Sequence, residues 1–309
     1  EVARANNAEV KAGRGSPHGG VFLDIASRLP AEEILRRLPS MYHQFKELAD
    51  VDITKEPMEV GPAQHYVMGG VEVDPDTGAS CVPGLFAAGE VSGGMHGSNR
   101  LGGNSLSDLL VFGRRAGMGA ADYVAKLTGD RPAVTAADIT AAQAEATAPL
   151  ERSGGENPYT VHAEVQQTMS DLVGIIRKEE EIKAALAELE KLRARAANVS
   201  AEGGPAYNPG WHLALDLRNI MLIADCVAQA ALERQESRGG HTRDDFPQMS
   251  AEWRKVNIIA ALDGDRVTLR RQPMTPMRDD LLGLFDRDEL KKYYTEPELP
   301  PATGKETTS

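Results

Sequence analysis

The sequence predicts an α+β protein, and three observations carry this prediction. Up to about residue 104, short runs of β-branched and apolar residues alternate with loops that are rich in glycine and proline. From about residue 130, the composition changes to helix formers with apolar residues at helical spacing. Residues 253–271 contain two strand-like runs around Asp263-Gly264-Asp265, which is the turn chemistry of a β-hairpin.

The first third of the chain is expected to hold short elements. We predict a helix over residues 1–13, a strand at Val21–Asp24, helices over Pro30–Leu38 and Pro39–Ala49, a linker over Val51–Val60, and strands at Val67–Val73 and Gly84–Ala88. Each of the two short helices opens on a proline, which the first turn tolerates because that position needs no N–H. The run Asp74–Gly78 is a turn, because Asp, Pro and Gly favour turn conformations.

Longer helices follow. We predict helices over Ser105–Leu127, Ala136–Glu151, Thr160–Arg177, Glu179–Ala197 and His212–Glu236. Apolar stripes are expected along Leu109, Leu110, Phe112 and Ala116, along Ile182, Leu186, Leu189 and Ala196, and along Leu213, Leu217, Ile220, Ala224 and Val227. Such stripes are typical of core packing, so the region after residue 130 is interpreted as a helical bundle. The tail after about Tyr294 is predicted to be extended or disordered.

Bulk properties exclude several classes of protein. The 309 residues suffice for two domains or one large one, and 41% hydrophobic with 26% charged residues is typical of globular chains. A net charge of −12 argues against a nucleic-acid partner, because phosphate binding needs clustered Lys and Arg. Cys81 and Cys226 are distant and lack CxxC spacing, which predicts free thiols in a reducing compartment. No run approaches the ~18 apolar residues of a transmembrane helix.

The loop from Gly89 to Asn104 is the first candidate site. Ligands of open α/β sheets gather at the carboxyl ends of strands, where Glu90 could accept hydrogen bonds from ribose hydroxyls. Five glycines lie between Gly93 and Gly103, and the loop then delivers Asn104-Ser105 as a helix start. A helix N-terminus favours negative charge, such as that of a reduced flavin ring. The alternative is a flexible surface turn with a good N-cap.

His65 and Arg100 are the candidate substrate ligands. An arginine offers a planar fork that matches one carboxylate, and a histidine can donate to a second carboxylate. Together they would suit a dicarboxylate that is anchored at both ends. Taken singly, His65 also fits a core histidine and Arg100 a structural ion pair, and their spacing does not show that they converge.

Three segments resemble one known family. HYVMGG at His65–Gly70, HGSNRLGGNSL at His96–Leu106 and ESRGGHTRDDFP at Glu236–Pro247 resemble, in family order, motifs of the succinate dehydrogenase and fumarate reductase flavoproteins. The resemblance extends over most of the chain. It implies an FAD cofactor and electron transfer to an iron–sulfur subunit. Through this partner it also implies a membrane anchor at the cytoplasmic face of the inner membrane.

The resemblance also implies roles for particular residues. It places Glu90, Ser105 and Leu106 on FAD, His65 and Arg100 on the carboxylates of succinate or fumarate, and Arg238, His241 and Arg243 along the same cleft or in support of it. For the last three, a structural polar network at a domain seam is the alternative.

The implied domains are the end of a capping domain, the C-terminal strand-and-loop part of a Rossmann-like FAD-binding domain, a helical domain, and a hairpin region with a tail. They are expected to cover residues 1–57, 58–129, 130–250 and 251–309, respectively. The chain opens on helix-like residues without an initiator Met, so we interpret it as the C-terminal part of a longer flavoprotein.

Several family features are expected upstream of this sequence. They are the dinucleotide-binding GxGxxG, the flavin-linking histidine, the first substrate threonine and glutamate, and the proton-transferring arginine, which would lie just before Glu1. No residue here is therefore assigned to proton transfer, and this chain alone is expected not to catalyse. Two alternatives remain: an L-aspartate oxidase-type flavoenzyme and a non-catalytic helical interaction module. The C-terminal hairpin and SRGGHTRDDFP favour the dehydrogenase.

Overall fold

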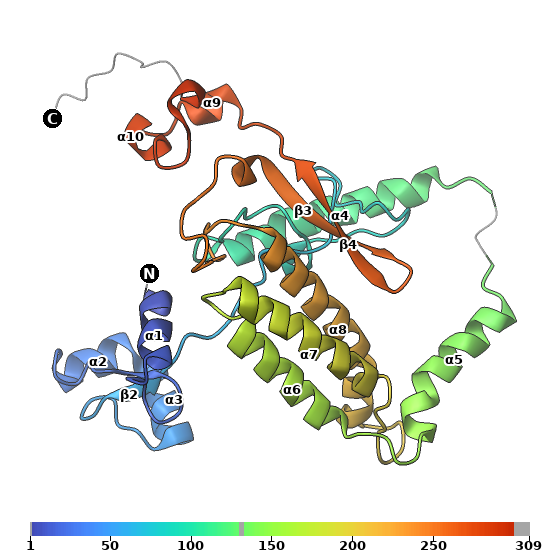
Figure 1. The fold of residues 1–309 in the computed structure, drawn as a ribbon, viewed down its shortest axis with the longest axis horizontal. Coiled ribbons are helices and arrows are strands. Elements are labelled where there is room, and N and C mark those ends of the chain that lie inside the picture. Colours follow the sequence, from blue (N-terminus) through green and yellow to red (C-terminus); the bar gives the residue numbers. More distant parts are fainter. Residues whose placement is uncertain (1, 130–132, 300–309) are drawn as a thin grey trace. The chain divides into compact units, whose positions relative to one another are not determined.

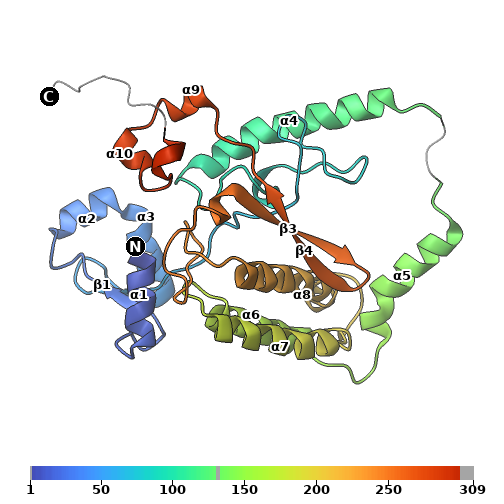
Figure 2. The same cartoon turned by 45° about the horizontal axis from the view of Figure 1, so that its top comes forward.

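The computed structural model describes residues 2–129 and 133–299. These residues form helices and two antiparallel β-ladders, each of two strands (Figures 1 and 2), which confirms the α+β class. The chain forms two compact units, which meet in sequence between Val67 and Met68.

Short helices and one small ladder build the first unit. Its elements are α1 (Val2–Lys11), β1 (Val21–Leu23), α2 (Ala31–Arg37), α3 (Pro39–Ala49) and β2 (Met58–Val60). The three helices and β1 agree with the predictions, with small shifts at their ends. β1 and β2 pair antiparallel, with Val21 opposite Val60.

The prediction of a linker over Val51–Val60 is wrong. Ile53 and Met58 are buried with Ile34 in the core of the first unit, and the end of the predicted linker is strand β2. A three-residue strand is too short to show a period, so its pairing partner decides its structure.

The second unit begins with an irregular segment and then helix α4 (Asn104–Lys126). The strands predicted at Val67–Val73 and Gly84–Ala88 are wrong, because a strand needs a ladder of hydrogen bonds to a neighbour. Across the described part of both segments only isolated bridges form, and Leu85 is half exposed. The bridges pair Val71 with Ser92, Val73 with Ser80 and Ala79 with Phe86.

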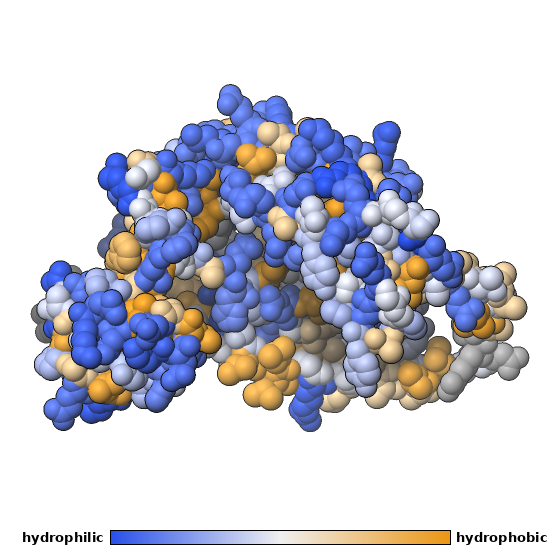
Figure 3. Space-filling model, turned by 90° about the horizontal axis from the view of Figure 1, so that it is seen from below, coloured by the Kyte–Doolittle hydropathy of each residue, from blue (hydrophilic) through white to orange (hydrophobic). Residues whose placement is uncertain are grey.

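The apolar stripe predicted along α4 is confirmed only in part. Ala116 is 8% exposed and Phe112 is partly buried, whereas Leu109 and Leu110 are 51% and 77% exposed. A Cβ on Gly78 would lie 2.7 Å from the Cβ of Ala116, so the helix rests on this turn through a small residue. Large apolar side chains therefore reach the surface among polar ones, as Figure 3 shows for one face.

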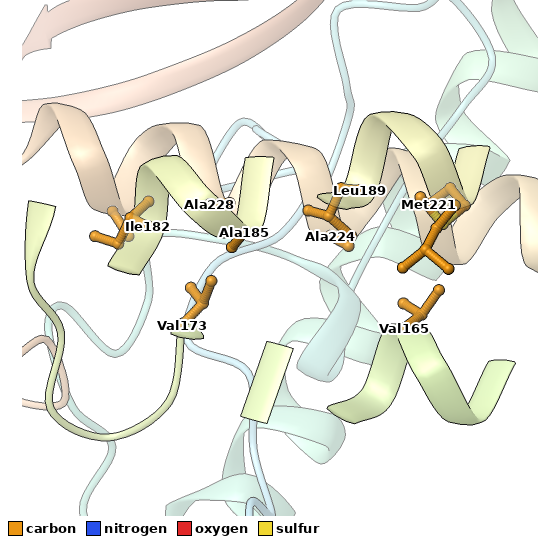
Figure 4. Packing of buried hydrophobic residues seen from close by; sticks show 10 residues of the cluster. Val165, Val173, Ile182, Ala185, Leu189, Met221, Ala224 and Ala228 are labelled. Carbon is orange, nitrogen blue, oxygen red and sulfur yellow. The ribbon is translucent and has the colours of Figure 1, made fainter. Parts of the chain in front are cut away.

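Four helices form the region that was predicted as a bundle. They are α5 (Ala136–Glu151), α6 (Pro158–Leu172), α7 (Glu179–Ala196) and α8 (Pro209–Glu233). Helices α6, α7 and α8 lie side by side in Figures 1 and 2, and their buried side chains meet between them (Figure 4). The buried members include Val165, Ile182, Ala185, Leu189, Leu192, Met221, Ala224 and Ala228.

The predicted stripes of α7 and α8 are largely confirmed. Ile182, Leu189, Leu217 and Ala224 are buried, but Val227 is 36% exposed because the core side of α8 follows Ala224, Ala228 and Ala231 instead. Helix α6 ends at Leu172, before the predicted end at Arg177. Valine, glycine and two isoleucines follow Leu172, and all of them are weak helix formers.

We expect Ile182→Val to lower the free energy of unfolding by about 1 kcal/mol, because it removes one buried methylene from a closed core. The buried position of Ile182 in the α6–α7–α8 core carries this expectation. Urea denaturation of the flavoprotein measures it. Ile139→Val on α5 is the matched control, since Ile139 is half exposed and should change little. Equal effects at both positions would contradict the assigned core.

The C-terminal part contains the predicted hairpin. Strands β3 (Val256–Asp263) and β4 (Arg266–Pro273) pair antiparallel, and Gly264 in the loop has φ +59°, the left-handed region that tight hairpin turns use. The first strand begins later than predicted, because residues 253–255 form the 3-10 helix η2 (Trp253–Lys255). The hairpin lies against α8, where Arg271 pairs with Glu233 at 2.7 Å.

Short turns of helix follow the hairpin: α9 (Asp279–Leu282), α10 (Arg287–Leu290) and η3 (Glu296–Glu298). The prediction of an extended or disordered tail after Tyr294 is wrong for residues 296–298, which form η3, with a capping box between the side chains of Thr295 and Glu298. Residues 300–309 lie outside the described chain.

Both cysteines are free thiols, as predicted: Cys81 is exposed and Cys226 is partly buried. Burial, helped by the neighbouring Asp225, raises the pKa of the Cys226 thiol. Among the residues that the structure describes, no helix is long and apolar enough to span a membrane. Within residues 2–129 and 133–299, no three His, Cys, Asp or Glu side chains gather as metal ligands.

Candidate active site

The loop that carries Arg100 is tied to the helix that follows it. Nε2 of His96, at the start of the loop, lies 3.2 Å from Oδ2 of Asp108 on α4. Asp108 is 4% exposed, so this contact is inside the protein. Gly103 ends the loop with φ +83°, a left-handed conformation that glycine adopts without strain.

Arg100 lies in the turn just before α4, as predicted. It is partly buried, and its Nη1 donates to the carbonyl of Leu101 at 3.0 Å. The guanidinium is thereby held against its own loop, beside the N-terminal end of the helix.

The N-terminal end of α4 can accept a negative group. No side chain caps it, and backbone N–H groups in the first turn carry the positive end of the helix dipole. Leu101 and Leu106 beside this turn are largely exposed. An apolar surface around N–H donors fits a flat ring with an anionic edge, such as the flavin of FAD.

Glu90 lies on an element that packs against α4. It is an exposed residue of the 3-10 helix η1 (Gly89–Val91). A Cβ on Gly89 would lie 2.5 Å from Cδ2 of Leu109, so η1 and α4 are close neighbours, and Gly89 has φ +75°, a left-handed conformation that favours glycine. The structure thus brings the carboxylate of Glu90 and the helix start with Ser105 onto neighbouring elements.

Glycine also closes the backbone junction beneath η1. A Cβ on Gly70 would lie 2.3 Å from the carbonyl oxygen of Val91, and one on Gly93 would lie 2.9 Å from the nitrogen of Gly70. These contacts fix the segment before η1 against the segment after it.

The two predicted substrate ligands lie on different units of the chain. His65 is exposed and belongs to the first unit, whereas Arg100 belongs to the second.

A buried carboxylate organises the segment after α8. Glu236 is 0% exposed and accepts hydrogen bonds from Arg234 at 2.7 Å, from Arg238 at 2.9 Å and from the backbone N–H of Ser250 at 2.9 Å. Burial alone would raise the pKa of Glu236, but these donors outweigh burial and lower it. Arg238 therefore points its guanidinium at Glu236.

His241 is held between an arginine and a carbonyl. Its Nδ1 lies 2.9 Å from Nη1 of Arg177, and its Nε2 lies 3.0 Å from the carbonyl oxygen of Arg234. Because arginine can only donate, Nδ1 accepts and the ring proton is on Nε2. Burial, together with the charges of nearby arginines, lowers the pKa of His241 to about 4, so the ring is neutral at pH 7.

Arg243 closes the end of α8. Its side chain is 0% exposed, and Nη1 donates to the carbonyls of Ala231 and Leu232 at 2.8 and 3.0 Å. The guanidinium also makes two bonds of 2.7 Å to Asp245, which lower the pKa of that carboxyl to about 2. Cations that bind the last carbonyls of a helix stabilise it.

Together these residues hold the turn 236–250. The tip of that turn reaches the Arg100 loop: the N–H of Gly240 donates to the carbonyl of Ser98 at 2.9 Å. Sequence reasoning missed Glu236, Gly239, Gly240, His96 and Asp108. A signal existed for two of them, because Asp108 interrupts an apolar helix and Glu236 opens the ESRGG segment.

This network predicts a loss of stability in mild acid. The folded-state pKa of His241 is about 4, below the ordinary 6.5, so the unfolded chain binds more protons between these values. Stability is therefore full above about pH 6.5 and falls as the pH drops toward 4. Denaturant midpoints between pH 7.5 and 4 should show a shallower fall for His241→Gln. The exposed His212→Gln on α8 is the control, and an unchanged slope in His241→Gln would contradict the assignment.

Two family models match the chain. The model of an FAD binding domain matches residues 1–106, and the model of the fumarate reductase flavoprotein C-terminus matches residues 162–281. A structure titled Mycobacterium smegmatis Sdh1 in complex with UQ1 is 66% identical with a TM-score of 0.88, over 96% of this chain and 50% of that chain. The chain belongs to the succinate dehydrogenase and fumarate reductase flavoprotein family.

Two curated relatives are more distant. One subunit of the fumarate reductase (CoM/CoB) of Methanothermobacter marburgensis is 39% identical over 84% of this chain and 46% of its own length. The succinate dehydrogenase flavoprotein subunit of Coxiella burnetii is 35% identical over 83% of this chain and 46% of its own length. This flavoprotein chain thus spans about half the length of the relatives it matches. The FAD binding match includes Glu90, Arg100 and Ser105, and the C-terminal match includes the turn 236–250.

Proposed function

We propose that the complete flavoprotein containing this chain interconverts succinate and fumarate with FAD and passes electrons to an iron–sulfur subunit. The observation that carries the proposal is the joint placement of Arg100 and an uncapped helix start on one glycine-rich loop. A carboxylate ligand and an anion-stabilising helix end are both required where a dicarboxylate exchanges a hydride with a flavin.

The cofactor-facing residues would be Glu90, Ser105 and Leu106. When bound, FAD supplies the acceptor for a hydride. The exposed carboxylate of Glu90 can accept hydrogen bonds from ribose hydroxyls. The backbone donors at Ser105 and Leu106 would favour negative charge on the ring, and the exposed leucine side chains would cover its apolar surface.

The substrate-facing residues would be His65 and Arg100. Arg100 would bind one carboxylate through its planar fork, and His65 would donate to the other. Anchoring at both ends orients the reacting carbon and removes the freedom that a loosely bound diacid would keep. No residue of this chain is proposed for proton transfer.

The expected assembly follows the family. We propose that the direct electron acceptor is an iron–sulfur subunit, which links the flavoprotein to a membrane anchor at the cytoplasmic face of the inner membrane. The proposed division is a capping segment at 1–57, FAD-binding residues at 58–129, a helical domain at 130–250 and a hairpin region at 251–309. Arg238, His241 and Arg243 would support the cleft through the turn that they hold.

An assay of the complete flavoprotein with an artificial electron carrier tests the function. We expect succinate to reduce the carrier, fumarate to oxidise a reduced carrier, and L-aspartate to support neither reaction. Bound FAD should be visible as flavin absorbance in the purified protein. Turnover of aspartate without turnover of succinate would replace the proposal by the aspartate oxidase alternative. Absence of bound flavin would instead favour the alternative of a non-catalytic helical interaction module.

A further inference from the structure

The tip of the turn 236–250 lies against the backbone of the Arg100 loop. Besides the hydrogen bond from Gly240 to the carbonyl of Ser98, Gly239 approaches this carbonyl so closely that a side chain has no room. A Cβ on Gly239 would lie 2.3 Å from the carbonyl oxygen of Ser98 and 2.6 Å from its carbon. Both of these atoms are backbone, so they can move only if the loop moves.

The turn is a firm support. Its tip is closed by the bridge between Arg238 and His241, with backbone bonds of 2.8 and 3.0 Å. Its sides are held by the buried Glu236 and by Arg243, which is anchored on the last carbonyls of α8. A displacement at the tip must therefore be taken up on the Ser98 side of the contact.

The Arg100 loop is also held in place close to Ser98. The contact between His96 and Asp108 holds the loop two residues before Ser98, and Arg100 follows two residues after it. The carbonyl of Ser98, which Gly239 and Gly240 contact, is thus the point nearest before Arg100 at which a remote segment holds the loop. Its position sets where the side chain of Arg100 starts.

We propose that Gly239 and Gly240 are positioning residues for Arg100, and so set how well the flavoprotein holds a substrate carboxylate. This inference rests on the proposed function and adds to it a second segment, remote in sequence. Replacing Gly239 by Ala must push the Ser98 carbonyl away by roughly 1 Å, and a misplacement of that size can cost about 10²-fold in rate.

The test uses the complete flavoprotein and Gly239→Ala. We expect kcat/KM for succinate to fall about 10- to 100-fold while FAD content per folded protein stays the same. Malonate, a dicarboxylate without a bond to desaturate, serves as the binding probe through the change in flavin absorbance. Its dissociation constant should rise by about 10-fold or more.

Gly264→Ala is the matched control. Gly264 has φ +59° and Gly239 has φ +57°, so alanine meets the same backbone strain at both positions, but nothing lies within 4 Å of a Cβ on Gly264. This control should not alter malonate binding.

A double-mutant cycle decides whether the effect passes through Arg100. Malonate affinity is measured for Gly239→Ala, for Arg100→Ala and for the pair; we expect the Gly239 effect to vanish when Arg100 is absent. Additive effects would overturn the inference, as would an unchanged malonate affinity in Gly239→Ala. Wild-type protein that neither oxidises succinate nor binds malonate would instead overturn the proposed function. If Gly239→Ala does not fold, His241→Gln loosens the turn from its other side and should weaken malonate binding by a few-fold; an unchanged affinity would overturn the inference.

Discussion

Arg100→Ala in the complete flavoprotein is expected to abolish turnover of succinate and leave the FAD content nearly intact. The guanidinium is the cationic fork of the loop before α4, whereas the proposed flavin contacts come from Glu90 and the helix backbone. Removing a donor that meets developing negative charge costs on the order of 10²–10³ in rate, and loss of carboxylate binding adds to this. Steady-state kinetics and the flavin-to-protein absorbance ratio measure the two quantities.

Two variants make this result specific. Arg100→Lys keeps the charge but loses the fork, so we expect it to recover only a small part of the activity. Arg115→Ala removes an exposed arginine of α4 that contacts the carbonyl of Pro75, and it should leave activity unchanged. If Arg100→Ala retains more than a few per cent of wild-type activity, or loses its FAD, the substrate role of Arg100 is wrong.

Arg243→Ala is expected to lower the free energy of unfolding by about 3–5 kcal/mol. The side chain is fully buried, so its removal leaves a cavity, leaves the carbonyls of Ala231 and Leu232 at the end of α8 without this donor, and removes two hydrogen bonds from the carboxylate of Asp245. Urea denaturation followed by far-ultraviolet circular dichroism measures this change, and the midpoint should move without a large change in slope.

The chain offers a matched control for this second prediction. Arg278 pairs with Asp280 at the same sequence separation and with two comparable bonds, of 2.9 and 2.6 Å, but both side chains are exposed. Arg278→Ala should therefore cost less than about 1 kcal/mol, since exposed ion pairs contribute little. Similar losses in the two variants would show that burial of Arg243 is not the source of its effect.

Patterns that are local in the chain were readable from the sequence. Helices α7 and α8 repeat their apolar residues at helical spacing, and the Asp-Gly turn marks the hairpin β3–β4, so both were predicted with nearly correct ends. The motif around Arg100 was readable for a similar reason, because its glycines and the helix start lie within a few residues of each other. In each case the deciding interactions join near neighbours in sequence.

Features that depend on partners remote in sequence were decided by the tertiary structure. Strand β2 exists because Val60 meets Val21, and the segment Val67–Val73 fails as a strand because it has only isolated bridges to neighbouring segments. The contacts of His241 are a further example, because its ring meets Arg177, which lies 64 residues away in sequence.

The contact of Gly239 with Ser98 is of the same kind. Glycine in ESRGG predicts a turn, but nothing in its local pattern tells which backbone the turn will meet. The turn is held on the end of α8 by the buried side chain of Arg243, and in this position its Gly239 lies against the loop of Arg100. Residue types and their spacing thus specify which chemical groups each local segment carries, whereas packing between remote segments specifies which of these segments lie against one another.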